Sequence, residues 1–540
     1  MRLKEKGKKI FFSCIWSSII SFCYVGGKML DLNDSIDFYD KTFYLKWLAA
    51  FVPTTILVYG IFFILNLLKE KKIFIEKRSD KIEKGKILLF IGGIVFLLIC
   101  WLPTWLSLYP GAFAYDAYDE WQQIKNSVIT EHHPVLHVLL VGGLVEGMYG
   151  VTGNYNVGIA VYCFLQMILL ASALSYSVCF LKELRLNKFI QYGTLIFYGI
   201  SPVCSLFSIC VTKDVLFTAA ELVFFIYIFR LISNPQKFFD KKAWRVGFVI
   251  ATLGTMILRN NGLYVALIML VLVGVLVKTY WKKYLLLLVC IFLPYTIYVG
   301  PMYKALDVEE GGVQEMLSVP LQQMARVYYH DKENMSPEDI DLLCYYVSEE
   351  NLLNYNSTLA DPVKTYFDAE YFSENTVEFF ELWFRIGVDN PLTYINSFLT
   401  NTVDFWYPNA IIDGYKEVYG KSSYFDYRVA PPGEEKVYLE SLHEFYERIS
   451  FDKEEQAKPL AFLMLSPGWY FICAFVLLGY FIYHKKYKAV ISSLVFWLTF
   501  LTVLLGPVAL VRYVLIFFMG IPQLIALGLV ETEEKTNEIC

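Results

Sequence analysis

Long apolar runs separated by short polar segments dominate the chain. Twelve runs are long enough to cross a bilayer, because a transmembrane helix needs about 20 mainly apolar residues. They lie at approximately 10–28, 45–68, 87–108, 156–181, 189–211, 214–232, 244–259, 262–277, 284–302, 462–483, 489–506 and 508–530. The pattern predicts an all-α polytopic membrane protein with about 12 transmembrane helices.

Basic residues concentrate in the short segments between these runs. Seven segments hold 28 of the 47 Lys and Arg residues: 1–9, 69–86, 182–188, 230–245, 278–283, 484–488 and 531–540. With twelve spans all seven lie on one side, which the positive-inside rule identifies as the cytoplasm. We therefore expect a multi-pass protein of the bacterial plasma membrane with both termini in the cytoplasm.

One further apolar segment, HPVLHVLLVGGLVEGMYG (133–150), resembles a span. Counting it as one would move 182–188 and every later basic loop to the outside, against the positive-inside rule. Its two adjacent glycines and its glutamate also suit a helix that lies at the membrane surface. We therefore expect juxtamembrane helices within an outer loop, 109–155.

Charge divides the chain into four expected domains. The region 303–461 carries 30 Asp and Glu against 12 Lys and Arg and is large enough to fold on its own. Within it, ENTVEFFELWFRIG (374–387) and SLHEFYERIS (441–450) have helical apolar periodicity, so we expect a mainly helical extracytoplasmic domain. Around it we place two N-terminal transmembrane helices with a basic loop (1–86), a transmembrane core (87–302) and three C-terminal helices with a short tail (462–540).

Composition excludes several classes of function. The chain is 56% hydrophobic and only 18% charged, which is typical of a membrane protein. It contains no GxxxxGK[ST] motif, no Rossmann glycine fingerprint and no CxxC pair. We expect no nucleic-acid partner. Any group that the protein transfers is expected to reach it on a membrane-bound donor.

Three carboxylates follow the third apolar run, in YPGAFAYDAYDEWQQ (109–123). If the segment after Pro110-Gly111 is helical, then Asp116, Asp119 and Glu120 have i, i+3 and i+4 spacing and share one face. Mutual repulsion at a low-dielectric border raises the pKa of at least one of them, which suits a general base. The alternative is a solvated interfacial helix anchored by its aromatic residues.

Three of the six histidines, His132, His133 and His137, lie within HHPVLH. Binding of a phosphate or a sugar hydroxyl is the first interpretation, and a helix-start cluster that faces lipid headgroups is the second. A zinc site at the i, i+4 pair His133 and His137 ranks third, because no HExxH-like motif accompanies it.

Cations stand at the outer ends of three spans, against the general charge trend. They are Lys213 in VTKDVLF, Arg259 in LRNNGLY and Arg512 in VALVRYVLIF. A charge at membrane depth is costly and usually faces a cavity or a partner. Either each cation forms its own pair, as Lys213 would with Asp214, or the three share a cavity that binds an anionic substrate. We favour the shared cavity.

Together these motifs resemble the C superfamily of glycosyltransferases (GT-C), multi-span enzymes that use polyprenyl-phosphate-linked sugars outside the cell. DAYDEW (116–121) is similar to the acidic motif of protein O-mannosyltransferases and aminoarabinose transferases, and HHPVLH is similar to their juxtamembrane H/K-P-P-L-like stretch. A closer resemblance is to an uncharacterised family of bacterial multi-pass proteins. In that family YPGAFAYD, HHPVLH, TKD, RNNG and a late RY recur in this order.

The resemblance implies a GT-C-like fold and an inverting sugar transfer from a polyprenyl-phosphate-sugar donor to a cell-envelope acceptor. It implies Asp116 as the general base, with Asp119 and Glu120 as alternatives. His132, His133, His137, Lys213, Arg259, Asn260, Arg512 and Tyr513 would bind substrate. No cofactor is required, although some members of the superfamily use a divalent metal. On this hypothesis Asp116 faces a cavity shared with Arg259 or Arg512.

Two other functions fit the same sequence. A transporter or flippase for a polyprenyl-linked or anionic lipid would use the same cations without a general base. A non-catalytic scaffold would use 303–461 to bind envelope partners, but it leaves the acid loop unexplained.

Overall fold

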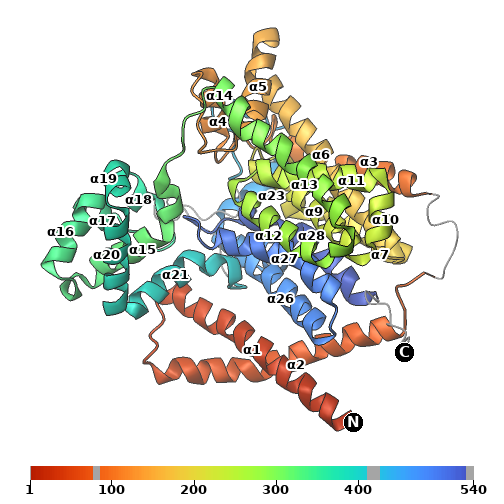
Figure 1. Ribbon diagram of the computed structural model, residues 1–540, viewed down its shortest axis with the longest axis horizontal. Coiled ribbons are helices and arrows are strands. Elements are labelled where there is room, and N and C mark those ends of the chain that lie inside the picture. The colour runs from red at the N-terminus through yellow and green to blue at the C-terminus, as the bar shows by residue number, and fades with distance from the viewer. Residues whose placement is uncertain (1, 77–84, 410–425, 531–540) are drawn as a thin grey trace.

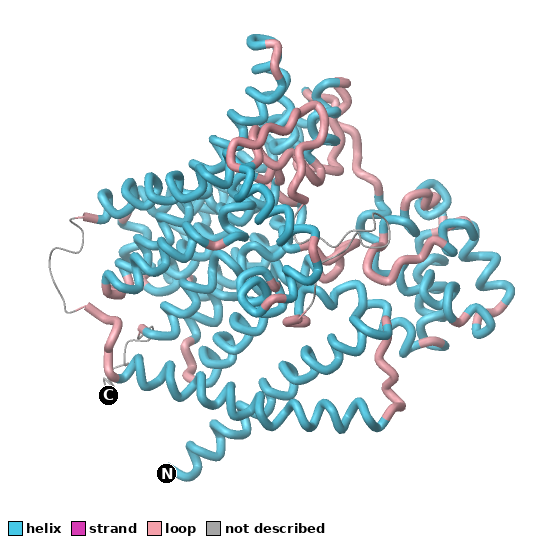
Figure 2. Tube along the Cα trace, turned by 180° about the vertical axis from the view of Figure 1, so that it is seen from behind, coloured by secondary structure: helices cyan, strands magenta, loops and turns pink. Residues whose placement is uncertain are grey.

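The computed structural model describes residues 2–76, 85–409 and 426–530. Over these residues the chain is helical, with isolated β-bridges and no β-strand (Figure 2). The all-α prediction is therefore confirmed for the described residues.

The N-terminal helices α1 (Arg2–Asn33) and α2 (Lys41–Glu70) form an antiparallel hairpin against the rest of the bundle (Figure 1). Asp40 caps α2 by accepting a hydrogen bond from the Thr42 backbone amide. Apolar side chains on the outward face of α2, such as Leu48 and Ile56, are exposed, as expected for a lipid-facing helix.

The centre of the bundle is α9 (Lys213–Ser233), which between its charged ends is apolar on all sides apart from Glu221 and is almost wholly buried. A helix with no polar face is stable only inside a large core or a membrane. The long helices that contact it are α6 (Tyr155–Glu183), α11 (Lys242–Ile257), α12 (Asn260–Leu276), α27 (Tyr487–Val503) and α28 (Leu515–Leu529). Outside these, α3 (Lys86–Ser107) packs on α6, α13 (Trp281–Ile297) on α11 and α26 (Pro467–Tyr483) on α28.

Among the described residues, eight helices are long and apolar enough to cross a membrane, or nine if a bent helix pair is one span. A polytopic helical membrane protein is therefore confirmed. The eight include α5 (Val135–Thr152), the segment interpreted above as juxtamembrane. In Figure 1, α5 points up the page while α2 runs across it. The count of twelve spans and the side on which each terminus lies stay predictions.

Two expected spans are interrupted. The run 189–211 forms α7 (Lys188–Ile200) and α8 (Pro202–Ile209), bent by 57° at Ser201, whose side chain caps α8. The run 508–530 begins with a loop and the 3-10 turn η6 (Val511–Val514) before α28 starts. Both interruptions leave polar backbone at depth, which is tolerated where it lines a cavity or is buried in protein.

The part of the acidic region that has its own hydrophobic core is shorter than the predicted domain 303–461. Buried apolar residues from Leu317 to Tyr394 form their own cluster. It is built by α15 (Ser318–His330), α16 (Pro337–Tyr346), α17 (Glu349–Leu353), α18 (Asp361–Lys364), α19 (Ala369–Glu374) and α20 (Thr376–Asp389). The helix α21 (Pro391–Trp406) joins the two cores, because Tyr394 belongs to this cluster while Val403, Phe405 and Trp406 belong to the core of the membrane bundle. The later helix α23 (Glu440–Phe451) packs into the core of the membrane bundle. Helices were predicted at 374–387 and 441–450, and α20 and α23 confirm them.

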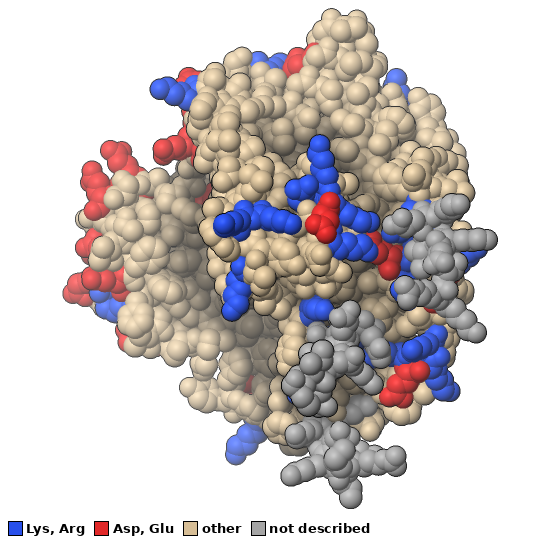
Figure 3. All heavy atoms as spheres, turned by 45° about the vertical axis from the view of Figure 1, so that its right-hand side comes forward, with Lys and Arg blue, Asp and Glu red and all other residues tan. Residues whose placement is uncertain are grey.

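The shorter helices connect these elements: α4 (Ala117–Lys125), α10 (Pro235–Asp240), α14 (Tyr303–Ala305), α24 (Lys453–Ala457) and α25 (Pro459–Leu465). Lys and Arg side chains gather on the face shown in the centre and right of Figure 3, while acidic side chains mark the domain of α15–α20 at the left. This arrangement agrees with the separation of charge that the sequence predicts.

Candidate functional site

Two extended segments that are far apart in the sequence run side by side and assemble the candidate site. The Ala112 amide donates to the Ile209 carbonyl at 3.0 Å, and the Val211 amide donates to the Ala112 carbonyl at 2.9 Å. The first segment leads into Asp116 at the start of α4, and the second leads into Lys213 at the start of α9. Their pairing places acid and base beside each other.

Gly111 is required for this close approach. Its φ of +135° lies in a region that side chains rarely adopt. A Cβ there would stand 2.2 Å from the Cys163 Sγ and 3.0 Å from the Ile209 carbonyl oxygen. The Pro-Gly pair therefore does more than end the third span, because it lets the acid loop pack directly on α6 and on residue 209.

A third segment, 426–438, closes the other side of the acid loop. The Ala430 amide donates to the Phe113 carbonyl and the Lys436 amide donates to the Tyr109 carbonyl, each at 2.8 Å. The Asp426 amide donates to the Tyr115 hydroxyl at 2.9 Å. The loop before Asp116 is thus held from two directions.

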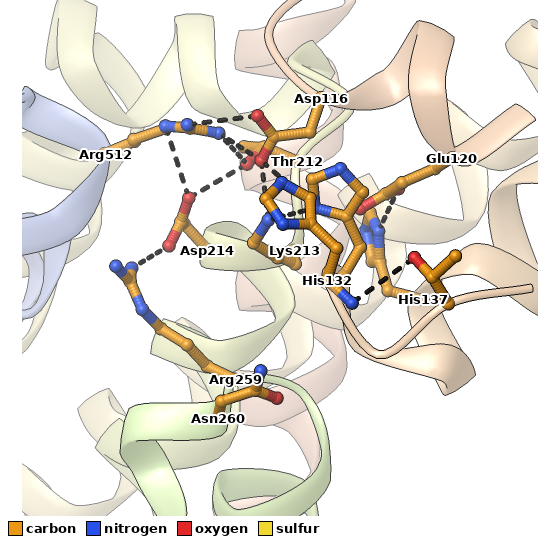
Figure 4. A network of polar contacts seen from close by, with 12 residues as sticks. Asp116, Glu120, His132, His137, Thr212, Lys213, Asp214, Arg259, Asn260 and Arg512 are labelled. Carbon is orange, nitrogen blue, oxygen red and sulfur yellow. Dashed lines mark hydrogen bonds and ion pairs between the residues drawn. The ribbon is translucent and has the colours of Figure 1, made fainter. Parts of the chain in front are cut away.

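Asp116 lies between two cations (Figure 4). Lys213 Nζ donates to Asp116 Oδ2 at 2.6 Å. The Arg512 guanidinium reaches both oxygens, at 2.9 Å for Oδ2 and 3.2 Å for Oδ1. Bidentate Arg–carboxylate pairs of this kind fix geometry as well as charge.

The electrostatic setting of Asp116 differs from that of an isolated carboxylate. Burial alone would raise the pKa of Asp116, but the Arg512 and Lys213 cations outweigh it and hold that pKa well below its usual range. Asp116 is therefore ionised at neutral pH, and while both cations hold it, it is a weak proton acceptor.

A second carboxylate, Asp214, forms an ion pair with the third cation, Arg259. Asp214 is fully buried and lies 3.6 Å from Arg512 Nε. The Thr212 hydroxyl donates to it at 3.0 Å. Lys213 does not pair with Asp214, so the one-to-one pairing considered from the sequence is not what forms.

Aromatic rings cover the two guanidinium groups. The ring of Tyr513 lies under both, 4.4 Å from Arg259 and 4.9 Å from Arg512, and Tyr115 lies 4.5 Å from Arg512. Cation–π contacts of this kind hold the guanidinium planes in place. Tyr513 therefore supports the cations.

His133 contacts the same lysine. Its Nδ1 lies 3.0 Å from Lys213 Nζ and 4.0 Å from Asp116 Oδ2. Burial and the neighbouring Lys213 cation lower the pKa of His133 to about 2. Because an ammonium only donates, Nδ1 accepts and the neutral ring carries its proton on Nε2.

The other two carboxylates of the acid loop lie elsewhere. The prediction of a helix is confirmed by α4, but Glu120 is buried and its Oε2 lies 2.5 Å from His137 Nδ1. The opposite ring nitrogen of His137 lies 2.7 Å from the Tyr162 hydroxyl. Asp119 is an exposed residue, but neighbouring atoms partly desolvate its carboxyl, and this together with the nearby Asp116 charge raises the pKa of Asp119. The three acids therefore do not act as one cluster.

These contacts also separate the pair considered for zinc, because His133 turns to Lys213 and His137 turns to Glu120. Within the described ranges no group of three or more His, Cys, Asp or Glu residues is placed to share a metal ion.

A cavity of about 750 Å³ opens beside Asp116. Its lining includes most residues expected to bind substrate: His132, His133, Lys213, Arg259, Asn260, Arg512 and Tyr513. His137, by contrast, is fully buried in the contacts above. Asp116 thus faces a cavity that it shares with Arg259 and Arg512, as expected.

The acidic domain supplies one wall of this cavity. Glu315, Asp361 and Lys364 line it, and Lys364 Nζ lies 2.6 Å from Glu315 and 2.9 Å from Asp361. The Ala360 amide donates to the Pro507 carbonyl at 2.8 Å, just before η6, which carries Arg512. The domain is therefore fastened next to the site.

An apolar groove of about 480 Å³ runs along α6, α9 and α11. At one end it is lined by Leu136, Leu216 and Leu258. Leu258 directly precedes Arg259, and Leu216 follows Asp214 by two residues. A cation-rich cavity and a hydrocarbon-like groove therefore begin at neighbouring residues.

Sequence reasoning missed several members of the site. Thr212 was not considered, and Asp214 was considered only as a one-to-one partner of Lys213, although an acid at the start of an apolar run was the available signal. The contributions of Tyr115, Glu315 and Lys364 depend on tertiary contacts and leave no local signal.

Comparison with known proteins gives a family but no function. No curated protein and no solved structure matches the chain. A family model matches residues 123–538, which include every histidine and cation of the site but begin just after Asp116, Asp119 and Glu120. The match covers more than three quarters of the chain, so the chain belongs to DUF6020, a family of unknown function.

Proposed function

We propose that the protein is a membrane glycosyltransferase of the GT-C type, which transfers a sugar from a polyprenyl-phosphate-linked donor to a cell-envelope acceptor. The observation that carries the proposal is a carboxylate, Asp116, in a cavity between Lys213 and Arg512 beside an apolar groove. The fold class and the EC 2.4 type of reaction rest on the sequence resemblance.

The donor is amphiphilic, and the molecule offers a matching pair of surfaces. Beside the cavity, Lys213, Arg259 and Arg512 outnumber the two carboxylates that they contact, Asp116 and the buried Asp214, which favours an anion at this point. A phosphate there is within reach of guanidinium groups that suit its geometry. The hydrocarbon chain would follow the groove that starts at Leu258.

Asp116 would serve as the general base once the donor is bound. The donor phosphate competes for Lys213 and Arg512, and withdrawal of these cations raises the pKa of Asp116. The acceptor oxygen then forms a bond to the anomeric carbon and its proton passes to Asp116. The bond from that carbon to the phosphate oxygen breaks, and the electron pair leaves with the polyprenyl phosphate.

The cations also stabilise the leaving phosphate, on which charge develops in the transition state. Attack from the face opposite the phosphate inverts the anomeric centre. No residue in this sequence of steps calls for a metal ion or another cofactor.

The test is a deletion strain whose surface glycopolymers, glycolipids and glycoproteins are analysed by mass spectrometry. We expect loss of one sugar substituent, restored by the wild-type gene. Asp116→Asn should accumulate in the membrane without restoring it, because loss of a general base costs about 10²–10⁴ in rate.

The matched control is Asp341→Asn, on the exposed surface of α16 and remote from the acid loop, which should restore the product fully. Normal glycosylation in cells that carry only Asp116→Asn would exclude Asp116 as the base. An unchanged set of glycoconjugates in the deletion strain would overturn the proposed reaction.

A flippase for an anionic lipid is the second candidate, and one observation favours it. The apolar groove reaches Tyr176 and Tyr227 at its other end, and both rings contact Arg230, at 5.1 and 5.2 Å. A cation therefore stands near each end of the groove. Purified protein that moves labelled polyprenyl phosphate across liposomes, with no glycosylated product in cells, would favour this function.

A further inference from the structure

A second, smaller pocket adjoins the cavity across the two consecutive histidines. It measures about 470 Å³ and lies between one face of α4 and the loop that follows it. Its lining is Asp119, Gln122, Gln123, Asn126, Val128, Thr130, His132 and His133. His132 and His133 also line the larger cavity, so the two spaces share a wall.

We propose that this pocket binds an uncharged, polyhydroxylated group, namely a sugar unit of the acceptor. The inference rests on the proposed function, because it takes the larger cavity as the place of the donor phosphate. It assigns the two substrates to opposite sides of the His132–His133 wall.

The polar groups of the pocket carry this assignment. Gln122 is engaged within α4, with the Tyr118 hydroxyl at 2.9 Å and the Asn126 amide nitrogen at 3.0 Å. Gln123 Oε1 accepts from the Thr130 amide at 3.0 Å and so holds the loop over the helix. These bonds leave the Gln123 amide nitrogen and the Asn126 carbonyl oxygen for a ligand.

Asp119 contributes a negatively charged hydrogen-bond acceptor to the pocket. Its carboxylate, on an exposed residue and only partly desolvated, forms none of the hydrogen bonds or ion pairs found among the described residues. Carboxylate, amide donor, amide acceptor and imidazole at neighbouring positions match the alternating donors and acceptors of a sugar ring. The negative charge of Asp119 disfavours a uronate or phosphate here.

The difference in charge between the two spaces indicates which substrate each of them binds. The larger cavity presents Lys213, Arg259 and Arg512, whereas the second pocket has no lysine or arginine in its lining. An anionic donor and a neutral acceptor are thereby sorted by charge. An acceptor hydroxyl that leans across the shared wall approaches Asp116, which lies 4.0 Å from His133.

The test uses full-length protein in nanodiscs and ligand-observed saturation-transfer NMR. The probes are methyl glucoside, methyl galactoside and methyl mannoside, with methyl glucuronide as the charged counterpart. At least one neutral glycoside should give a protein-dependent signal, and the glucuronide should bind about tenfold more weakly.

Two variants localise that signal. Asp119→Asn, which preserves shape, and Asn126→Ala should each weaken glycoside binding about tenfold, since the first removes the charge that strengthens a ligand hydrogen bond and the second removes a ligand hydrogen bond. Lys125→Ala is the control, because Lys125 lies over the Trp121 ring at 4.5 Å and does not line the pocket. Unaltered binding in both pocket variants, or equal binding of the glucuronide, would overturn the assignment.

Binding of polyprenyl monophosphate to the same nanodiscs separates this inference from the proposed function. Wild type, Asp119→Asn and Asn126→Ala should bind it equally. Glycoside binding without polyprenyl monophosphate binding would overturn the proposed donor while the pocket stands. Polyprenyl monophosphate binding with no signal from any neutral glycoside would overturn the pocket and leave the donor in place.

Discussion

Two ionic clusters stand at opposite ends of α9, and they differ in what encloses them. The Asp116 cluster (Asp116, Lys213, Asp214, Arg259 and Arg512) surrounds the first turn of the helix. The Arg230 cluster (Lys86, Tyr176, Glu183, Arg230 and Trp244) surrounds the last turn, and Lys86 Nζ belongs to it because it lies 3.8 Å from Glu183 Oε2. Each holds cations that are largely buried beside carboxylates and aromatic rings.

Only the Asp116 cluster lines the cation-rich cavity, whereas the Arg230 cluster borders the apolar groove through the Tyr176 ring. In the Arg230 cluster, Glu183 lies 2.8 Å from the guanidinium, Tyr176 bonds to it and Trp244 covers it at 4.8 Å. The paired extended segments before Asp116 and Lys213 position the Asp116 cluster so that one side of it faces the cavity. Buried charge is therefore a weak indicator of a site unless the charged groups themselves line an accessible cavity.

Replacing the central arginine of each cluster gives the largest expected effect. Arg512→Gln leaves Asp116 with Lys213 alone, and Arg230→Gln leaves Glu183 with Lys86 alone, so each should destabilise the protein by up to about 3–5 kcal/mol. Only Arg512→Gln should also abolish binding of polyprenyl monophosphate, measured by microscale thermophoresis in nanodiscs. Thermal unfolding of both variants supplies the stability comparison.

Arg512→Lys keeps the charge and should restore folding with partial binding, which separates loss of the site from loss of the fold. Equal loss of binding in Arg230→Gln would remove the distinction between the clusters.

From the sequence, the helices and the residues of the Asp116 site could be predicted, but the contacts among those residues could not. Apolar periodicity placed helices in the right regions, and the cost of charge at membrane depth singled out Lys213, Arg259 and Arg512. These three do lie with Asp116, although Arg512 is almost 400 residues further along the chain.

Roles within the acid loop could not be predicted, because spacing does not show what lies opposite each residue. Asp116, Asp119 and Glu120 share the spacing of one helical face, yet Glu120 meets His137 and Asp116 meets two cations. The break before η6 was likewise hidden, since 508–530 has the composition of one continuous span.

Acid should weaken the Asp116 cluster through His133. Its pKa is about 2 in the folded protein against 6.5 when free, so the unfolded state binds more protons between these values. The contribution of neutral His133 to the free energy of unfolding is therefore present above pH 6.5. It falls as the pH drops below that value, by about 1.4 kcal/mol per pH unit. Between pH 6.5 and 5 the loss should reach about 2 kcal/mol.

Thermal unfolding in detergent across this pH range measures the slope. His133→Asn keeps an acceptor for Lys213 but does not titrate, so its slope should be smaller. The Arg230 cluster contains no histidine, and Glu183→Gln should leave the slope at its wild-type value. A slope that is the same in His133→Asn would show that another group dominates.

Removal of the internal carboxylate should strengthen anion binding at one cluster only. In Asp116→Asn the phosphate no longer competes with a bound carboxylate for Lys213 and Arg512. We expect polyprenyl monophosphate to bind about tenfold more tightly, corresponding to about 1.4 kcal/mol. The same measurement on Glu183→Gln should give the wild-type affinity, and weaker binding by Asp116→Asn would contradict the exchange of carboxylate for phosphate.

The smallest effect should come from changing the shape of a cation without its charge. Arg259 lies on Tyr513 at 4.4 Å, as Arg230 lies on Trp244 at 4.8 Å, and lysine stacks less well than arginine. A loss of about 0.5–1 kcal/mol predicts two- to fivefold weaker binding of polyprenyl monophosphate by Arg259→Lys. Arg230→Lys has the same loss of stacking but should bind normally. If both substitutions reduced affinity alike, stacking would act through the bundle as a whole, and the cavity would no longer distinguish the two clusters.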